Sequence, residues 1–352
     1  SCPISAIRKK ALYLLSKRFQ KIMKRHVAKP FVKWVGGKGQ LIPTFTARLP
    51  YNFEKLEKLT YIEPFVGGGA MLFFMLQTYP NIEKAIINDL NPDLVKAYNM
   101  VKNSPESLVR SLYAIQKEYL DITEEEKRKE FFVSIRTRFN RAQLSDIDNT
   151  TYFIFLNKTC FNGLYRVNSK GEFNVPFGKY VRPTICDEKT IYADSELLQK
   201  VEIISGDFEQ TERYVSANTF IYFDPPYRPL DATSSFNSYA KEAFNDAEQI
   251  RLKKYFDRLS GKECLMMLSN SDCKGRNPED TFFDELYKDY IIERVYATRS
   301  VNANAEKRGK LTELLIRNYM HTSADESNSH LHCLDSNINA SNYVQSTYGR
   351  TI

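Results

Sequence analysis

Six short apolar runs constrain the fold of this chain more than any other feature. They span residues 59–66, 84–89, 201–205, 219–223, 264–269 and 312–318. Their length and their content of Ile, Val, Leu and aromatic residues are typical of buried strands. Residues 70–77 (AMLFFMLQ), between the first two runs, read as a helix. Strands interleaved with helices predict an α/β fold with a largely parallel sheet.

The stretch between the second and third runs interrupts this alternation. From Pro92 to about Asn149 the pattern is helical and charged, and residues 157–182 mix turn residues, aromatics and basic groups, as in a hairpin. We therefore expect an inserted lobe at 93–200 between two parts of one core domain, residues 29–92 and 201–320. A chain of 352 residues is long enough to form both.

The two ends differ in composition from the body. Nine Lys and Arg residues lie between Arg8 and Lys29, and no acidic residue precedes Glu54. Residues 1–28 predict a basic amphipathic helix packed on the body; a phosphate-binding arm or a transit-peptide-like segment is the alternative. Residues 321–352 are rich in Ser and Asn, which predicts a disordered tail.

Composition narrows the class of protein. A hydrophobic content of 42% is ordinary for a soluble globular chain, and no apolar run is long enough to span a membrane. Six scattered cysteines without a C-x-x-C pair fit a reduced interior. The net charge of +7 favours a polyanionic partner. We expect a cytoplasmic or nucleoid-associated protein, with organellar or nuclear targeting by the basic N-terminus as the alternative.

Histidine is absent from the whole body of the chain. The four histidines are His26, His321, His330 and His332. This distribution argues against a Ser-His-Asp or Cys-His hydrolase and against a His-ligated zinc site. We therefore expect chemistry that needs neither imidazole nor a metal.

A glycine turn and a carboxylate point to a nucleoside ligand. Gly67, Gly68 and Gly69 follow the first strand, and Asp89 ends the next, where a carboxylate can bind both ribose hydroxyls. The alternative for Asp89 is a helix N-cap. Since neither a G-x-G-x-x-G turn nor a phosphate loop is present, a nucleoside without phosphate, S-adenosylmethionine, fits best.

Two further segments extend this ligand site. Trp34 and Lys38, in FVKWVGGKGQL, are placed against the amino acid tail of such a cofactor; the alternative is a packing residue and a surface lysine. Asp207 and Phe208 follow the third strand and could bind the adenine by hydrogen bond and ring contact. A simple turn explains these two residues equally well.

The fourth strand ends in Asp224-Pro225-Pro226-Tyr227. Because the prolines lack N–H groups, this strand end offers a carboxylate, an unpaired carbonyl and an aromatic ring together. We interpret it as a clamp in which Asp224 and the Pro225 carbonyl accept the two N–H bonds of an amine and Tyr227 stacks on its ring. A strand-terminating turn is the alternative.

Together these segments resemble the Dam-type DNA adenine N6-methyltransferases, which act at GATC. The resemblance covers roughly Pro30 to Tyr319 and runs, in order, through KWVGGK, YIEPFVGGG, INDLN, FNGLYRVNSKGEFNVPFGKY, SGDF, DPPY and LSNSD. It implies a Rossmann-like S-adenosylmethionine-dependent fold with a helical and hairpin lobe that recognises double-stranded DNA. It also implies that the target base leaves the duplex.

The resemblance also assigns roles to single residues. It implies that S-adenosylmethionine is contacted by Trp34, Lys38, Asp89 and Asp224, in a pocket lined by Phe65, Asp207 and Phe208. For DNA, Lys33 matches the residue that reads the first guanine and Arg166 the one that reads a guanine on the far side. The other matched positions are Asn162 in the gap of the extruded base, Leu164 and Pro176 on thymine, and Asn168 and Tyr180 in support. A plain surface hairpin is the alternative for this stretch.

Other functions compete with this interpretation. The amine acceptor could be an RNA adenine or a protein amide, and a catalytically silent DNA-binding module is a different class. A hydride-transferring nucleotide enzyme fits the glycine spacing less well. The resemblance also raises a cognate restriction endonuclease as a partner.

Overall fold

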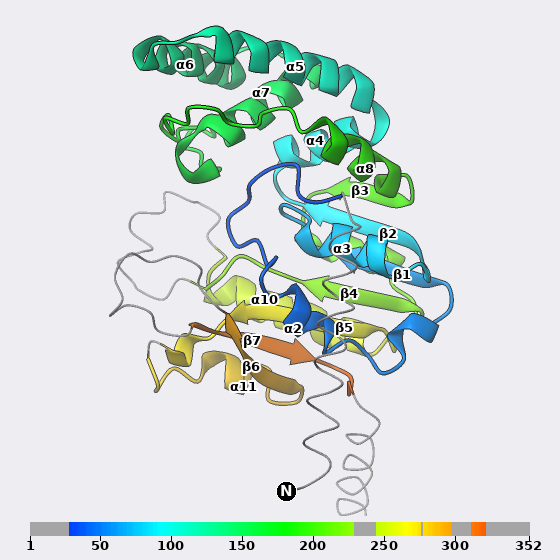
Figure 1. Ribbon diagram of the computed structural model, residues 1–352. Coiled ribbons are helices and arrows are strands. Elements are labelled where there is room, and N and C mark those ends of the chain that lie inside the picture. The colour runs from blue at the N-terminus through cyan, green and yellow to red at the C-terminus, as the bar shows by residue number, and fades with distance from the viewer. Residues whose placement is uncertain (1–27, 229–243, 276, 298–310, 322–352) are drawn as a thin grey trace, which may run out of the picture.

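The computed structural model describes residues 28–228, 244–275, 277–297 and 311–321 (Figure 1). They form a seven-stranded sheet in the order β3-β2-β1-β4-β5-β7-β6. The strands β1 to β5 pair in parallel, whereas β7 runs antiparallel to both of its neighbours. Their bounds are β1 Leu59–Glu63, β2 Ile82–Asp89, β3 Val201–Ser205, β4 Thr219–Phe223, β5 Leu265–Ser271, β6 Ile291–Ala297 and β7 Leu311–Arg317.

All six predicted strands are present, and the predicted α/β class is confirmed. The first strand is shorter than expected and stops at Glu63, because Pro64 cannot continue a ladder. β6 was not predicted. Among the described strands it lies at the edge of the sheet beside β7, and Glu293 and Arg294 interrupt its apolar pattern.

Side chains of the central strands alternate between two cores, as the pleat requires. One core joins Tyr61 and Tyr222 to the helix α3 (Ala70–Thr78). The other joins Ile62 and Ile221 to α10 (Asp246–Ser260). Because helices cover both faces, the strands are buried on both sides and read as continuous apolar runs.

The segment predicted to be helical contains four helices, α4 (Pro92–Asn103), α5 (Pro105–Asp121), α6 (Glu125–Arg141) and α7 (Asp146–Thr159). Helix α4 packs on β2 and β3 and also on α7, whereas α5 and α6 pack on α7, at the top of Figure 1. A further helix, α8 (Glu188–Leu198), returns the chain to β3. The remaining helices are short: α2 (Ile42–Thr46), α11 (Phe282–Leu286), and the 3-10 turns η1 (Phe53–Lys55), η2 (Phe161–Gly163), η3 (Phe208–Tyr214) and η4 (Cys273–Gly275).

The expected hairpin is present as residues 160–178, hereafter the hairpin. Antiparallel bridges pair Cys160 with Phe177 and Val167 with Phe173. The side chain of Asn140, on α6, both donates to and accepts from the backbone of Phe173, at 2.9 and 2.8 Å. These two hydrogen bonds attach the hairpin to helix α6.

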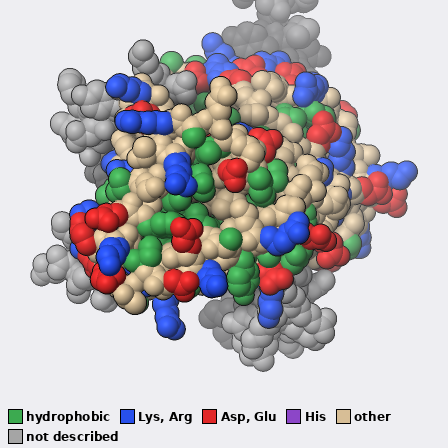
Figure 2. Space-filling model, turned by 90° about the horizontal axis from the view of Figure 1, so that it is seen from above, with side chains coloured by type: hydrophobic (Ala, Val, Ile, Leu, Met, Phe, Trp, Pro, Cys, Tyr) green, Lys and Arg blue, Asp and Glu red, His purple; other side chains and the backbone are tan. Residues whose placement is uncertain are grey.

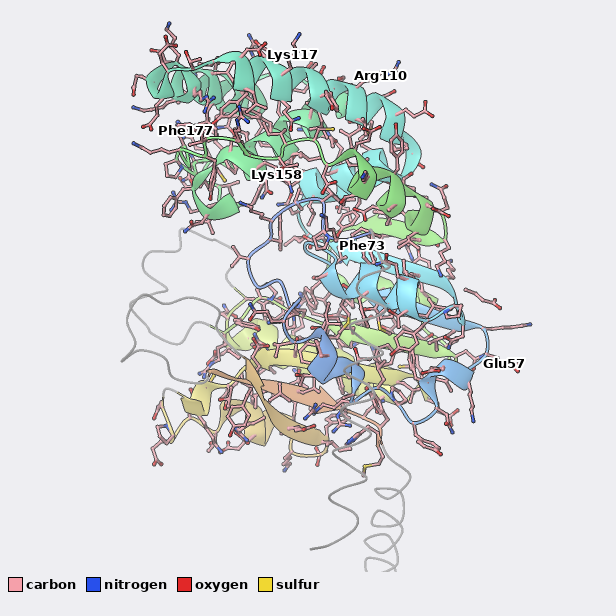
Figure 3. The ribbon with its side chains drawn as sticks, viewed as in Figure 1. Glu57, Phe73, Arg110, Lys117, Lys158 and Phe177 are labelled. Carbon is pink, nitrogen blue, oxygen red and sulfur yellow. The ribbon has the colours of Figure 1, made fainter. Side chains whose placement is uncertain are left out.

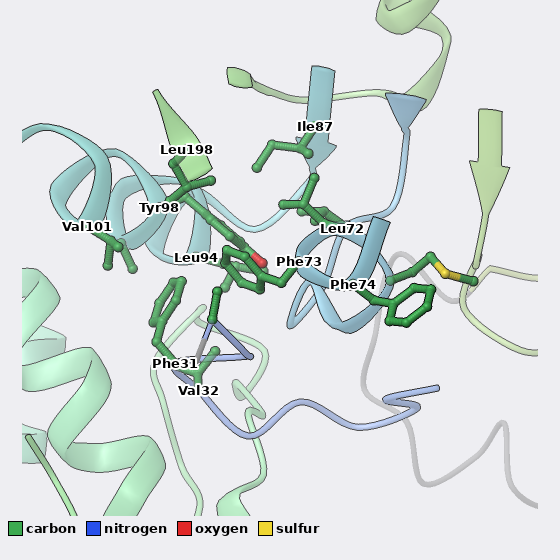
Figure 4. Close-up of a cluster of buried hydrophobic side chains, with 14 of the residues drawn as sticks. Phe31, Val32, Leu72, Phe73, Phe74, Ile87, Leu94, Tyr98, Val101 and Leu198 are labelled. Atoms are coloured by element: carbon green, nitrogen blue, oxygen red, sulfur yellow. The ribbon is translucent and has the colours of Figure 1, made fainter. Parts of the chain in front are cut away.

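Residues 28–38, hereafter the linking segment, run between the upper helices and the sheet, as the dark blue trace in Figure 1 shows. Its Phe31 and Val32 lie against Leu94 and Tyr98 (Figure 4), and the rings of Phe31 and Tyr98 meet edge to face at 5.0 Å. Gln77, on α3, exchanges two hydrogen bonds with the backbone of Ala28. These contacts fix the segment before it reaches the site.

Some expectations lie outside the described residues. These are the N-terminal helix, which lies almost wholly within residues 1–27, and the tail beyond His321. In the described part of the chain no helix is long and apolar enough to cross a membrane. The four cysteines described, Cys160, Cys186, Cys264 and Cys273, are free and buried.

Candidate functional site

A cavity of about 820 Å³ lies where the parallel strands end. Residues that follow β1, β2, β3 and β4 line it, together with part of the linking segment and the start of α10. The carboxyl ends of parallel strands are the usual place for ligands in such sheets, because loops from several strands converge there. The topology therefore brings together the four motifs that the sequence analysis singled out.

The glycine turn after β1 lines the cavity, and its backbone conformation and close contacts require glycine. Gly67 and Gly69 have φ values of 49° and 75°, which side chains rarely allow. A Cβ atom on Gly67 would lie 2.8 Å from Cδ1 of Trp34, and one on Gly69 would lie 2.4 Å from the Tyr98 hydroxyl. Only glycine lets Trp34 and the backbone approach this closely.

Asp89 is fixed at the end of β2 by backbone groups. The Gly67 N–H donates to its Oδ2 at 3.0 Å, and the Asn91 N–H donates to its Oδ1 at 2.9 Å. Burial raises the pKa of this carboxyl, although the backbone N–H groups oppose the shift. The N-cap of α4 is Asn91, whose side chain accepts from Asp93 and Leu94, so Asp89 is not needed as the cap.

Two neighbours of these residues complete this end of the cavity. Asn88 donates from Nδ2 to the carbonyls of Pro64 and Gly206, whereas its buried Oδ1 has no partner in the described part of the chain. Trp34 stacks on Tyr165 with ring centroids 5.6 Å apart. Asn88 therefore fastens the loops after β1 and β3 to each other, and Trp34 and Tyr165 form an aromatic wall.

Asp207 and Phe208 lie beside one guanidinium. Arg251, on α10, donates to both carboxylate oxygens of Asp207 at 3.0 and 2.7 Å and lies 4.1 Å from the centroid of the Phe208 ring. This ion pair lowers the pKa of Asp207. Phe65 and Phe244 pack against Phe208, so three aromatic rings gather here.

Asp224 lies in a cluster of charges at the end of β4. Its Oδ1 is 3.5 Å from Nζ of Lys38 and accepts from the Ser269 hydroxyl at 3.3 Å. Burial, against the opposing effect of Lys38 and with a smaller contribution from Glu313, raises the pKa of Asp224 to about 6. Nζ of Lys38 is also 3.2 Å from Oε2 of Glu313. Lys38 is thus a buried ion-pair partner and not a surface lysine.

The rest of the Asp-Pro-Pro-Tyr segment is held from two sides. Gln249, on α10, donates to the Pro226 carbonyl at 3.2 Å, which leaves the Pro225 carbonyl as the candidate acceptor. Tyr227 is 38% exposed as a residue, and Nζ of Lys38 lies 4.0 Å from the centroid of its ring. A carboxylate and a partly exposed aromatic ring therefore face the same cavity.

Glu63 is a cavity residue that the sequence analysis did not assign. It is buried at the end of β1, and the Tyr61 hydroxyl donates to it at 2.5 Å. Burial raises the pKa of Glu63 to about 8, although the Tyr61 hydrogen bond opposes this. Its position as an acid at a strand end, like Asp89 and Asp224, was the signal that could have identified it.

Lys33 links the predicted DNA-binding residues to the cavity. The Asn157 side chain, on α7, bonds both to the backbone of Lys33, at 2.8 Å in each direction, and to the Gly163 carbonyl. Nζ of Lys33 lies 4.7 Å from the centroid of the Tyr180 ring. Lys33 and Tyr180, predicted from distant segments, are therefore adjacent.

The hairpin presents its polar side chains in two ways. Arg166 is exposed and donates from Nε to the Asn174 side chain at 2.7 Å. Asn168 forms the turn, since its Oδ1 accepts the N–H groups of Lys170 and Glu172. Arg166 is thus available to a partner, whereas Asn168 supports the loop.

The remaining hairpin positions lie nearer the helices. Asn162 is exposed with a φ of 54°, Pro176 is exposed, and Leu164 is half-buried against the core. Lys158, labelled beneath the upper helices in Figure 3, has a pKa lowered to about 8 by burial and by Lys33.

The face seen from above in Figure 2 has acidic and basic side chains interspersed. Such a mixture of charges does not suit a polyanion.

Among the described residues no group of three His, Cys, Asp or Glu side chains could hold a metal ion. The acidic residues of the cavity pair instead with Lys38, Arg251, Tyr61 or backbone N–H groups. What the cavity presents is a set of carboxylates, aromatic rings and a glycine turn. These groups suit an organic cofactor and an amine.

Comparisons with known proteins agree with this geometry. Residues 34–301 match the family model of the D12 class N6 adenine-specific DNA methyltransferases. A type II methyltransferase of Methanocaldococcus jannaschii is 47% identical over 83% of this chain and 99% of its own length. Another, of Lactococcus lactis subsp. cremoris, is 39% identical over 83% and 95%. A DNA adenine methylase of Haemophilus influenzae is 32% identical over 82% and 92%.

The family match spans the glycine turn, the carboxylates at the strand ends, the hairpin and the Asp-Pro-Pro-Tyr segment. The resemblance noted in the sequence is therefore confirmed, and with it the Rossmann-like methyltransferase fold. Family membership implies DNA as the substrate and a methyl donor as the cosubstrate. The chain belongs to the D12 class N6 adenine-specific DNA methyltransferases, and it is an adenine-specific DNA methyltransferase.

Proposed function

We propose that this enzyme transfers a methyl group from S-adenosylmethionine to N6 of an adenine flipped out of double-stranded DNA, at GATC. The observation that carries the proposal is the position of Asp224. Its carboxylate ends β4 in the cavity, beside the Pro225 carbonyl and the partly exposed ring of Tyr227. A flat base with an exocyclic amine fits these three groups.

The cavity residues fit S-adenosylmethionine. Asp89 would hold the ribose hydroxyls, since each of its oxygens keeps lone pairs beyond the backbone bonds it accepts. Phe65, Phe208 and Asp207 would hold the adenine of the cofactor, and Trp34, Lys38 and the Gly67 turn would border its amino acid tail. Bound there, the cofactor supplies an electrophilic methyl group on sulfur.

The protein's own part in the chemistry is to prepare the amine. The lone pair of adenine N6 is delocalised into the ring, which makes it a poor nucleophile. When Asp224 and the Pro225 carbonyl accept its two N–H bonds, the nitrogen is biased toward a tetrahedral arrangement with a free lone pair. The proton leaves afterwards to Asp224 or to solvent. Positioning and electrostatics therefore account for catalysis without an imidazole base.

Recognition of GATC is proposed for the hairpin and the linking segment. Lys33 and Arg166 would each donate to a guanine, because both carry donors that suit its O6 and N7 acceptors. Leu164 and Pro176 would contact thymine methyl groups, and Asn162 would fill the gap left by the extruded adenine. Asn168 and Tyr180 would support these contacts.

The test is transfer of labelled methyl from S-adenosylmethionine to two short duplexes. One contains GATC, and in the other the guanine next to the adenine is replaced. Label in the first alone is expected. Label in both would keep the chemistry but remove the specificity assigned to Lys33 and Arg166. Preferential labelling of an RNA competitor, or failure to bind the cofactor, would support RNA methylation or a silent binding module instead.

A cognate restriction endonuclease is proposed as a cellular counterpart. Two of the relatives are named type II methyltransferases, which supports this idea. DNA from cells that express this protein should resist an endonuclease that cuts only unmethylated GATC. Cleavage of that DNA at every site would contradict the proposal.

A further inference from the structure

The buried ammonium of Lys38 contacts two carboxylates and an aromatic ring. Its side chain is only 4% exposed, and Nζ lies 3.2 Å from Glu313, 3.5 Å from Asp224 and 4.0 Å from the centroid of the Tyr227 ring. A buried ammonium must stay paired, because a buried charge without a partner is strongly destabilising. Lys38 can therefore lose one carboxylate only if the other remains.

The carboxylate of Asp224 contacts other side chains in the structure, and in the proposed reaction it must also accept from the substrate. In the structure its Oδ1 faces Lys38 and also accepts from Ser269. In the proposed reaction the carboxylate must turn its acceptor capacity to the adenine amine. If Asp224 were the sole partner of Lys38, binding the amine would compete with a buried ion pair.

Glu313 relieves this competition from outside the cavity. It lies on β7, where its backbone pairs with Ser271 on β5 and with Val295 on β6, and it is not one of the residues that line the cavity. Its carboxylate is the nearer of the two to Nζ. It therefore lies where it can hold Lys38 without touching substrate.

We infer that Glu313 is a positioning residue that holds the Lys38 ammonium and so releases Asp224 to accept the adenine amine. This inference rests on the proposed function, since it gives Asp224 the role stated there. It adds a residue from a strand that no motif marked. It also explains why two half-buried carboxylates pair with the same ammonium.

The charged and titratable groups around Asp224 make the role of Glu313 visible in the pH dependence of the methylation rate. Lys38 favours its ionised form, whereas the acidic groups near it are Glu313, Tyr222, Tyr61 and Glu63. Asp224 must be ionised to accept the amine, so the methylation rate should fall as the pH drops through about 6. Removing the negative charge of Glu313 lowers the pKa of Asp224 and moves this fall to lower pH.

The experiment is single-turnover methylation of a GATC duplex at saturating cofactor, between pH 5 and 8, for the wild type and Glu313→Gln. The variant should react about tenfold more slowly at pH 8, because Lys38 now holds Asp224, and the midpoint of its acid limb should lie about one pH unit lower. Glu293→Gln, on β6, is the control. Glu293 pairs with Arg48 and Arg317, away from the cavity, so both the rate and the midpoint should be unchanged.

Lys38→Met tests the same cluster from the other side. Without the ammonium the pKa of Asp224 rises, so the midpoint should move to higher pH, and adding Glu313→Gln to this variant should not slow the pH 8 rate further. A loss of folded protein scales each curve without moving its midpoint. If Glu313→Gln does not fold, Glu313→Asp, which keeps the charge but shortens its reach toward Nζ of Lys38, should slow the pH 8 rate in the same direction by a smaller factor, and an unchanged rate in that variant would overturn the inference. Wild-type rate and midpoint in Glu313→Gln would overturn the inference alone. No methylation by the wild type would overturn the proposed function as well.

Discussion

The cavity and the hairpin are stabilised in opposite ways. Each key group of the cavity ends a strand or touches one, and its partners come from distant parts of the chain, as with Asp224 and Lys38 or Asp207 and Arg251. The exposed side chains of the hairpin instead pair with near neighbours in the sequence, as Arg166 does with Asn174 and Asn168 with Glu172, while helix α6 holds its backbone through Asn140. In the proposed function, the chemistry thus rests on preset groups in the cavity, whereas the reading of DNA rests mainly on exposed side chains.

A substitution in the cavity should lower the methylation rate on every DNA sequence. Asp224→Ala should reduce the single-turnover rate by on the order of 10²–10³-fold, the usual cost of losing one preset electrostatic group. Thermal unfolding should change little, because a raised pKa shows that burying this carboxylate is unfavourable to the fold. Near-normal turnover would remove the mechanism.

A hairpin substitution should instead change which DNA is methylated. Arg166→Ala should cost about 1–3 kcal/mol of discrimination at one guanine and leave the rate on the best sequence less affected. The measurement is kcat/KM on GATC and on duplexes substituted at each position. Asn174→Ala, which removes only the partner of Arg166, should show the same pattern with a smaller effect. A uniform loss across all sequences would instead indicate a phosphate contact.

The glycine turn tests whether the cavity is as rigid as its contacts indicate. Gly67→Ala should destabilise the protein by about 1–2 kcal/mol, since its φ is 49° and the new Cβ would meet Trp34 at 2.8 Å. Cofactor affinity should fall with it, as isothermal titration would measure. Gly261→Ala is the matched control, because φ there is −66° and the nearest atom is 3.5 Å away. Equal stability of the two variants would contradict this reading.

The smallest effect is expected at the hairpin turn. Asn168→Ala removes two hydrogen bonds from backbone N–H groups to its side chain, at a cost of about 1 kcal/mol confined to the hairpin. DNA affinity should weaken by several-fold, whereas the unfolding midpoint of the body should not move. A large drop in that midpoint would show that the hairpin and the core unfold together.

The sequence predicted the parts of the site that follow strands. Asp89, Asp207 and Asp224 could be identified because an apolar run followed by a carboxylate is a local pattern, and parallel strands bring such ends together. Lys33 and Arg166 came from the family resemblance rather than from any local rule. Their roles in DNA recognition stay predictions.

The residues that were missed act through contacts between distant segments. Glu313 lies within an apolar strand, and nothing near it in the sequence indicates Lys38 as its partner. Arg251 and Gln249 lie on an ordinary amphipathic helix, and only the packing of α10 against the sheet brings them to Asp207 and Pro226. Such pairings depend on the complete topology, so a local pattern could not predict them.

The linking segment has a consequence for engineering new specificity. Within six residues it places Lys33 beside the hairpin, through Asn157, and Lys38 beside Asp224. If Lys33 reads a guanine as proposed, a hairpin transplanted from a relative with another target would meet a Lys33 still suited to the old one. The smallest portable unit is the hairpin together with residues 28–38, and exchanging that unit alters the catalytic centre as well. New target sequences should thus be easier to obtain by substituting exposed side chains than by swapping whole modules.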